Sequence, residues 1–467
     1  MVAARFVPPL FGFALNVGVA RLLGADGFGA YLALLALLAV FQAAAAAGMQ
    51  FHLTREIAAH PERAPQLLVQ ARSFALASGT ATTVLYLLYV AVVIPPAQRL
   101  AGVWLATTLL PSAFIGVQES VFLGLRVHQF VGLVGVIEHV AKLALGLSVL
   151  AAGGGLFALS GAIAVARWIG LAAGAFCIRR LDIGETWMVD TAAIVPFARA
   201  IAPFSVLFAL SMAYFRVDVP IMLLLVGPDA AGVYGAASGL FMAVMLLPDA
   251  VMAAVYPRIV AAARGSRDTY LQATWLVARL TTMTLAMAAL VVMVLAEPSI
   301  GIIYGGRYAA SVDVLLWLAL CLPVFALNGV LGQALQAGGE QRAMLGVVLT
   351  GLVTHVILNL ALVAAYGVLG APLALLGSGL TVAAGALWVV HRRVRRLVIA
   401  GQVLFIAAAI VVPLLLTLVA TASARPYVAM AGLVWLTFAA WGRGFLSSPE
   451  WTNAVSALRA GDSRSRL

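Results

Sequence analysis

The chain has 467 residues, of which 64% are hydrophobic and only 10% are charged, and its mean hydropathy is +1.08. Soluble domains carry about 25% charged residues, so this composition excludes a soluble globular protein and indicates a polytopic membrane protein. The formal net charge is +11, but the arginines are dispersed among short loops, which excludes the clustered basic face of a nucleic-acid-binding protein. Cys177 and Cys321 lie in apolar stretches and give neither a disulfide framework nor a metal-ligand spacing.

Fourteen segments are long and apolar enough to be membrane helices of about 20 residues each. In chain order, the predicted spans are 4 to 23, 30 to 49, 73 to 94, 101 to 124, 130 to 152, 155 to 178, 203 to 226, 231 to 255, 273 to 296, 311 to 336, 342 to 365, 368 to 390, 397 to 419 and 426 to 445. Of the 28 lysines and arginines, 21 then fall on one side of the membrane. The positive-inside rule therefore predicts that both termini are cytoplasmic.

The chain also repeats part of its own sequence. Gly24, Asp26, Gly29, Tyr31, Met49 and Arg55 correspond to Gly227, Asp229, Gly232, Tyr234, Met252 and Arg258, at a constant offset of 203 residues. Each copy is predicted to be a hairpin turn followed by an apolar helix and an arginine. Internal repeats that move against each other are typical of membrane transporters, so the repeat favours transport without naming a substrate.

These patterns predict an all-α polytopic membrane protein with about 14 transmembrane helices. The predicted parts are an N-terminal six-helix lobe (1 to 178), a cytoplasmic connector (179 to 202), a C-terminal six-helix lobe (203 to 391), an extra helix pair (392 to 446) and a cytoplasmic tail (447 to 467). Six spans in each lobe give both lobes the same orientation, which is a parallel repeat about an axis normal to the membrane.

Charged residues at bilayer depth are the main functional candidates, because each costs roughly 2.5 to 3.5 kcal/mol near the bilayer centre. In the fifth span, Glu138 and Lys142 are four residues apart and share a helix face, with His139 beside them. One interpretation is a cavity-lining charge with a proton relay, since histidine titrates near neutral pH. The other is a self-neutralised pair that bridges packed helices.

The seventh span carries Arg216 and Asp218, which are two residues apart, do not share a helix face and are expected to have different partners. Pro220 can bend this helix, and such breaks often accompany substrate sites. The alternative is a kink in a packing helix with two interhelical ion pairs. The same two interpretations apply to Arg167 in the sixth span and Asp249 in the eighth.

Three arginines lie at the ends of predicted spans. Arg21 precedes the first turn of the repeat, where we expect it to face a central cleft. Arg55 and Arg258 are equivalent residues at the cytoplasmic ends of their spans. They are either topology signals under the positive-inside rule or a pair of guanidinium groups that grip a phosphate or diphosphate.

His355 and Asn359 are four residues apart in the eleventh span. No carboxylate or cysteine accompanies them as a metal site would require, so we expect hydrogen bonds between helices. The sequence carries no Ser-His-Asp signature, and we predict neither a cofactor nor enzymatic activity.

Several stretches together resemble one family. They are RLLGADGFGAY followed by TREIA, then FRVDVPIMLLLVGPDAAGVYGAASGL, LLPDAVMAAVYPRI, and YGGRYAASVDVLLWLAL through LNLALVAAYGVLGAPLAL. They resemble the polysaccharide transporter family, which includes O-antigen and exopolysaccharide flippases, in the multidrug/oligosaccharidyl-lipid/polysaccharide (MOP) superfamily. The resemblance implies a MATE-like fold in a bacterial inner membrane, with two six-helix lobes around a cationic cavity. It also implies an undecaprenyl-diphosphate-linked oligosaccharide as substrate, flipped to the periplasmic leaflet.

This resemblance gives roles to the charged residues and names partners. Expected substrate ligands are Arg21, Arg55, Lys142, Arg167, Arg216 and Arg258, and expected ion-coupling or charge-balancing residues are Glu138, His139, Asp218 and Asp249. The expected partners are the lipid-linked oligosaccharide and the bilayer, without nucleic acid. Polysaccharide polymerase machinery is a further candidate, at the loop HRRVRR.

Three alternatives remain open from the residues alone. A MATE-type drug or cation antiporter would be expected to have an acidic cavity, whereas these spans carry mixed charge. A lipid II flippase differs only in its substrate. A membrane glycan polymerase or ligase would be expected to carry a large periplasmic loop, and the longest predicted outer connection, Glu297 to Val312, is short.

Overall fold

The computed structural model describes residues 2–46, 48–181, 188–245, 267–394 and 400–442. In these residues every extended regular element is a helix, and eight helical segments are long and apolar enough to cross a membrane. The predicted all-α, multi-pass membrane fold is confirmed. The chain separates into two compact units, Met1–Gly235 and Ala236–Leu467. The predicted lobe boundaries remain a prediction.

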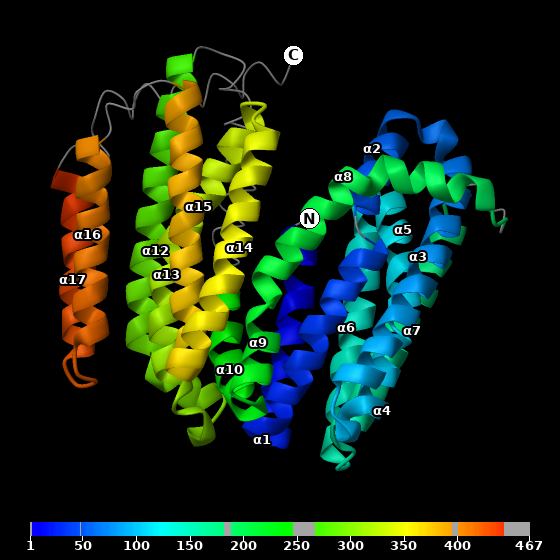
Figure 1. Ribbon diagram of the computed structural model, residues 1–467, viewed down its shortest axis with the longest axis horizontal. Coiled ribbons are helices and arrows are strands. Elements are labelled where there is room, and N and C mark those ends of the chain that lie inside the picture. The colour runs from blue at the N-terminus through cyan, green and yellow to red at the C-terminus, as the bar shows by residue number, and fades with distance from the viewer. Residues whose placement is uncertain (1, 47, 182–187, 246–266, 395–399, 443–467) are drawn as a thin grey trace. The chain divides into compact units, whose positions relative to one another are not determined.

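The first unit contains nine α-helices and one short 3-10 helix among its described residues (Figure 1). They are α1 (Val2–Ala46), α2 (Met49–Ala59), η1 (Pro61–Arg63), α3 (Ala64–Val93), α4 (Pro96–Ala106), α5 (Leu109–Gly124), α6 (His128–Ala151), α7 (Gly155–Arg179), α8 (Thr191–Arg216) and α9 (Asp218–Leu225). Helix α10 (Pro228–Val244) runs from the first unit into the second.

Helix α2 packs against α3, α5 and the first half of α8. Met49, Leu53 and Ile57 recur every four residues on one face of α2 and pack into a core with α3, α5 and α8. Helix α8 begins at Thr191, earlier than the predicted span at 203, because Asp190 caps it. The Asp190 carboxylate accepts hydrogen bonds from the backbone N–H of Ala192 (3.0 Å) and Ala193 (3.2 Å).

The two copies of the sequence repeat contain the same backbone feature. Gly24 interrupts α1 with φ 74°, and its equivalent Gly227 has φ 119° just before α10. Side chains other than glycine rarely adopt this left-handed region, so each copy uses glycine to turn the chain. The predicted turn at Gly24 is therefore present, as a break inside one continuous helical segment.

The repeated segments also touch each other at equivalent residues. A Cβ on Gly29 would collide with the backbone carbonyl of Pro228, and a Cβ on Gly232 would collide with the backbone carbonyl of Ala25. Because Ala25 and Pro228 are 203 residues apart, as are Gly29 and Gly232, the contact is reciprocal. Reciprocal contacts between equivalent residues are the signature of two-fold symmetry.

A tyrosine secures each hairpin to the helix before it. The Tyr31 hydroxyl donates to Asn16 Oδ1 at 3.2 Å, and the equivalent Tyr234 hydroxyl donates to Asp218 Oδ2 at 2.6 Å. The two acceptors are offset by one residue in the repeat, and one is an amide whereas the other is a carboxylate. Both tyrosines are buried.

The second unit continues with six α-helices and two short 3-10 helices in the described residues. They are α12 (Arg267–Ile303), η2 (Gly306–Tyr308), α13 (Ser311–Ala337), α14 (Gln341–Tyr366), η3 (Gly367–Leu369), α15 (Gly370–Val394), α16 (Ala400–Val419) and α17 (Arg425–Gly442). Helices α12 and α13 pack together, as do α14 and α15, and the α16–α17 pair contacts α12 (Figure 1).

Helices α14 and α15 are joined by a fully buried polar triad of His355, Asn359 and Ser378. Ser378 Oγ donates to the Leu375 carbonyl at 3.0 Å, so His355 Nδ1, 3.0 Å from Oγ, acts as the donor to Ser378. His355 Nε2 then accepts from Asn359 Nδ2 at 3.2 Å. The interhelical hydrogen bonding expected of His355 is present, and Ser378 is a partner that the sequence analysis missed.

Replacing His355 with leucine is expected to destabilise the protein by about 1–3 kcal/mol, because it removes two buried hydrogen bonds. Thermal unfolding in detergent measures this effect. The matched control is Thr350→Val on the same helix, since Thr350 is exposed and bonds only its own helix, to the Gly346 carbonyl at 2.9 Å. Equal stability of the two variants would contradict a structural role for the triad.

Candidate functional site

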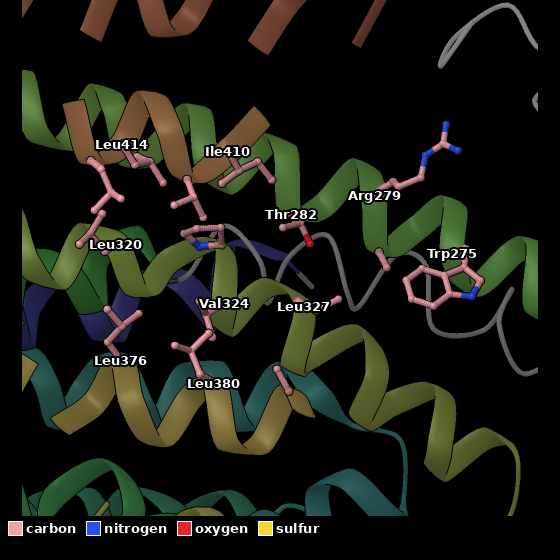
Figure 2. A pocket seen from close by; sticks show the side chains of 15 residues that line it. Trp275, Arg279, Thr282, Leu320, Val324, Leu327, Leu376, Leu380, Ile410 and Leu414 are labelled. Carbon is pink, nitrogen blue, oxygen red and sulfur yellow. The ribbon is translucent and has the colours of Figure 1, made fainter. Parts of the chain in front are cut away.

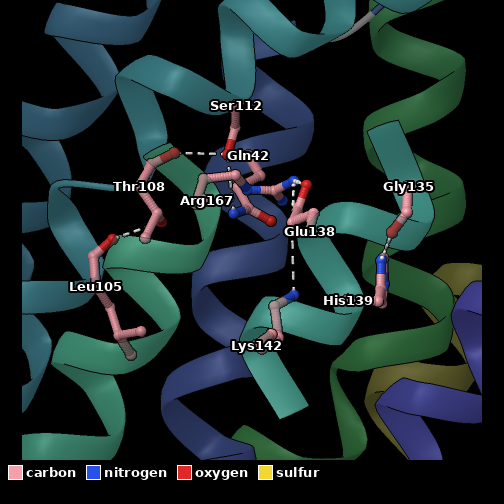
Figure 3. Close-up of polar contacts among 9 residues, drawn as sticks. All are labelled: Gln42, Leu105, Thr108, Ser112, Gly135, Glu138, His139, Lys142 and Arg167. Atoms are coloured by element: carbon pink, nitrogen blue, oxygen red, sulfur yellow. Dashed lines mark hydrogen bonds and ion pairs between the residues drawn. The ribbon is translucent and has the colours of Figure 1, made fainter. Parts of the chain in front are cut away.

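A cluster of three charged side chains lies inside the first unit, between α6 and α7 (Figure 3). Arg167 Nη1 lies 2.9 Å from Glu138 Oε1 and 3.0 Å from Oε2. Lys142 Nζ lies 3.5 Å from Glu138 Oε1. One carboxylate therefore holds two cations, one from its own helix and one from the neighbouring helix.

Local sequence explains how the three groups meet. The four-residue spacing of Glu138 and Lys142 places both on one face of α6. On α7, Gly170 lies against Glu138, and a Cβ there would come within 2.9 Å of Oε2. Four residues further on, Gly174 lies against Gln118 of α5 in the same way. This small-residue spacing lets α7 approach α5 and α6 closely enough for Arg167 to reach the carboxylate.

The cluster is unevenly buried. The Glu138 side chain is 4% exposed, whereas those of Lys142 and Arg167 are 21% and 22% exposed. With all three groups ionised, the cluster carries one excess positive charge. Charges at bilayer depth are retained when they are paired or lie along a functional path. The partly exposed cations can therefore bind an anion while the carboxylate lies behind them.

Two further titratable groups lie near the cluster. His139 Nδ1 is 2.8 Å from the Gly135 carbonyl, so that nitrogen carries a proton and the ring is tied to its own helix (Figure 3). Glu119 of α5 interacts electrostatically with both Arg167 and Glu138. The sequence analysis missed Glu119, although a carboxylate inside the predicted span 101 to 124 was a sufficient signal.

The other predicted site residues lie elsewhere in the described chain. Arg216 is exposed at the last residue of α8, and Asp218 is 5% exposed at the first residue of α9, where it accepts from Tyr234. The helix break between them falls at Val217, within one turn of Pro220, whose ring disfavours a preceding helical turn. Arg21 and Arg55 are exposed on α1 and α2. Asp249 and Arg258 lie outside the described residues.

The second unit contains an apolar cavity of about 340 Å³ between α12, α13, α15 and α16 (Figure 2). Its walls are almost entirely aliphatic, and Trp275 and Arg279 of α12 lie at one end of it (Figure 2). Among the lining residues are Leu320, Val324, Leu327, Leu376, Leu380, Ile410 and Leu414. The cavity suits a hydrocarbon chain, and it carries no part of the charged chemistry of the α6–α7 cluster.

These features define the class of protein. Apolar spanning helices, an internal repeat with reciprocal contacts and a cationic cluster at bilayer depth together describe a multi-pass membrane transporter. The family model for polysaccharide biosynthesis proteins matches residues 2–263. The chain belongs to this family. A second model, for the lipid II flippase MurJ, matches residues 230–440. No curated protein matches the sequence.

Solved structures share the fold at low sequence identity. The lipid II flippase MurJ in an inward closed conformation matches with a TM-score of 0.77 and 14% identity, covering 96% of this chain and 99% of that one. An inward-facing MATE family multidrug transporter matches at 0.67 and 15%, covering 82% and 94%. A MOP superfamily transporter from Pyrococcus furiosus matches at 0.58 and 15%, covering 87% and 93%. The predicted MATE-like fold and the predicted polysaccharide transporter family are confirmed.

Proposed function

We propose that this protein flips a polyprenyl-diphosphate-linked oligosaccharide from the cytoplasmic to the outer leaflet by alternating access. The observation that carries the proposal is the cluster in which Lys142 and Arg167 share the single carboxylate of Glu138. A diphosphate cannot enter hydrocarbon unaided, because desolvation of its charges is too costly. Guanidinium groups match phosphate geometry and compensate that cost.

The substrate path is assigned from charge and location. Lys142 and Arg167 are the proposed ligands of the diphosphate, and the exposed Arg21, Arg55 and Arg216 are proposed ligands at other stages of transport. Arg258 is given the same role by its equivalence to Arg55 in the repeat. The proposed charge-balancing and ion-coupling residues are Glu138, His139, Asp218 and Asp249.

The apolar cavity of the second unit is the proposed site for part of the polyprenyl tail. Its volume of about 340 Å³ and its aliphatic lining suit several isoprene units. A cavity with this lining gives a polyprenyl chain van der Waals contact, and a sugar would find few hydrogen-bonding partners there.

The proposed cellular setting follows the charge distribution along the chain. The protein lies in a bacterial inner membrane with both termini cytoplasmic, and its carrier lipid is undecaprenyl diphosphate. Two six-helix lobes with a cytoplasmic connector and an extra helix pair remain the proposed organisation. Transport needs no bond making in the substrate, so we propose that the protein is not an enzyme. A polysaccharide polymerase is a proposed partner.

Lipid II transport is the second candidate function, favoured by the MurJ model match over residues 230–440. Lipid II shares the diphosphate and the polyprenyl tail, so the same cluster suits both substrates. Export of a cationic drug is disfavoured by the net positive charge of the Glu138 cluster.

Deletion of the gene is expected to leave the complete lipid-linked oligosaccharide on the cytoplasmic face of the membrane. Leaflet-resolved labelling of the extracted lipids measures this, with rescue by the wild-type gene and no rescue by Arg216→Ala. Accumulation of lipid II instead would select the second candidate. If no lipid-linked intermediate accumulates and the cells become sensitive to cationic drugs, the flippase proposal is wrong.

A further inference from the structure

We infer that substrate binding is coupled to proton uptake by Glu138: the diphosphate takes Arg167 and Lys142 away from this carboxylate, which then binds a proton. The inference rests on the proposed function and deepens it by naming the coupled ion. Its starting point is the sharing of one carboxylate between two cations, at 2.9 Å from Arg167 and 3.5 Å from Lys142.

The first step is competition between two anions for the same cations. Arg167 uses Nη1 for both carboxylate oxygens, at 2.9 and 3.0 Å. A diphosphate diester carries two negative charges and accepts paired hydrogen bonds from a guanidinium, whereas Glu138 offers one charge. The cations are about one fifth exposed and the carboxylate is 4% exposed, so an arriving anion meets the cations first. Without substrate, Glu138 therefore pairs with the two cations that the diphosphate would bind.

The second step concerns what remains around Glu138 after the exchange. On α7, the residue that lies against Glu138 is Gly170, which carries no charge. On α5, the nearby ionisable group is Glu119. On α6 itself, His139 is bonded to the Gly135 carbonyl. Helix α1 packs on α6 through Leu15 and Gly18. Of its charged side chains that the structure describes, Arg21 lies between Gly18 and the Gly24 break, and Asp26 lies past that break.

A buried carboxylate without a cation is neutralised rather than kept charged, because the desolvation cost of the anion is not repaid. The balance is simple: the Glu138 carboxylate and one proton from water give the neutral acid when the diphosphate binds. When the diphosphate leaves, Arg167 and Lys142 return and the proton is released. Binding therefore adds the two negative charges of the diphosphate and the one positive charge of the proton, so the net charge of the complex changes by one and not by two.

The test is calorimetric titration of the purified full-length protein in detergent with a synthetic farnesyl-diphosphate N-acetylglucosamine. This diester has no ionisation of its own near neutral pH, and buffers of different ionisation enthalpy report the protons exchanged. We expect about one proton taken up per ligand, with affinity falling about tenfold for each unit of rising pH. Glu138→Gln is expected to abolish proton uptake and to make binding independent of pH.

Glu62→Gln is the matched control, since Glu62 is exposed on η1 with a side chain 69% exposed, and it should behave as wild type. If Glu138→Gln does not fold, Glu138→Gln/Lys142→Met removes one charge of each sign and should also lose proton uptake. Binding without proton uptake in the wild type overturns the inference, as does loss of uptake in Glu119→Gln but not in Glu138→Gln. No binding of the diphosphate by the wild type would instead count against the proposed function.

Discussion

Replacing Arg167 with glutamine is expected to stop translocation and to lower the free energy of unfolding by about 3 kcal/mol. The substitution removes the closest cation from Glu138, which is 4% exposed and keeps only Lys142 at 3.5 Å. Removing one partner of a buried ion pair costs about 3–5 kcal/mol, and the remaining lysine places this case at the lower end. A flipping assay in proteoliposomes and thermal unfolding in detergent measure the two effects.

Two variants separate charge pairing from substrate binding. Arg180→Gln at the C-cap of α7 is the matched control, because Arg180 is exposed and lies over the Phe176 ring at 4.9 Å. Glu138→Gln/Arg167→Gln is expected to recover much of the stability without recovering transport, since no buried charge is left without its partner. Wild-type transport by Arg167→Gln would contradict the role of the cluster.

Alanine at Gly29 or at Gly232 is expected to slow transport by about 5- to 150-fold. Each added Cβ meets a backbone carbonyl of the other repeat copy, at Pro228 or Ala25. Overpacking of this kind costs about 1–3 kcal/mol, which is the penalty on the conformation in which the two hairpins touch. If alternating access passes through this conformation in every cycle, its loss limits the rate.

The reciprocity of the contact sharpens this prediction, because the two substitutions should have similar effects and their combination should be no milder than either. Gly12→Ala in α1 is the control, since a Cβ there meets nothing within 4 Å. Rates are compared in proteoliposomes at matched protein content. Normal transport by both Gly29→Ala and Gly232→Ala would show that the hairpin contact plays no part in the cycle.

The sequence predicted those features that depend on spacing along the chain. The offset of 203 residues predicted equivalent hairpins, and the structure places glycines with positive φ at both Gly24 and Gly227. The four-residue spacing of Glu138 and Lys142 likewise predicted that they share a helix face, and the structure shows them paired, which was one of the two interpretations left open. These predictions succeeded because helix periodicity and backbone sterics act locally.

Features that depend on which helices are neighbours could not be predicted in this way. Arg167 was a separate candidate in the sequence, and its pairing with Glu138 requires α7 to lie close to α6 at Gly170. Ser378 was missed for the same reason, since hydropathy gives the depth of a residue and not the direction it faces. Glu119 was different, because its place inside a predicted span was a sufficient signal that the sequence analysis did not use. The early start of α8 could have been predicted from Asp190, because aspartate is a preferred N-cap residue.

Translocation by the purified protein is the most direct measurement of the proposed function. Liposomes containing the protein and a fluorescent undecaprenyl-diphosphate oligosaccharide are treated with a membrane-impermeant reductant that destroys only label in the outer leaflet. We expect the wild type to make the inner-leaflet label accessible and Arg167→Gln to leave it protected. Protection of that label by the wild type, equal to that of protein-free liposomes, would contradict the assignment of this protein as a flippase of lipid-linked oligosaccharides.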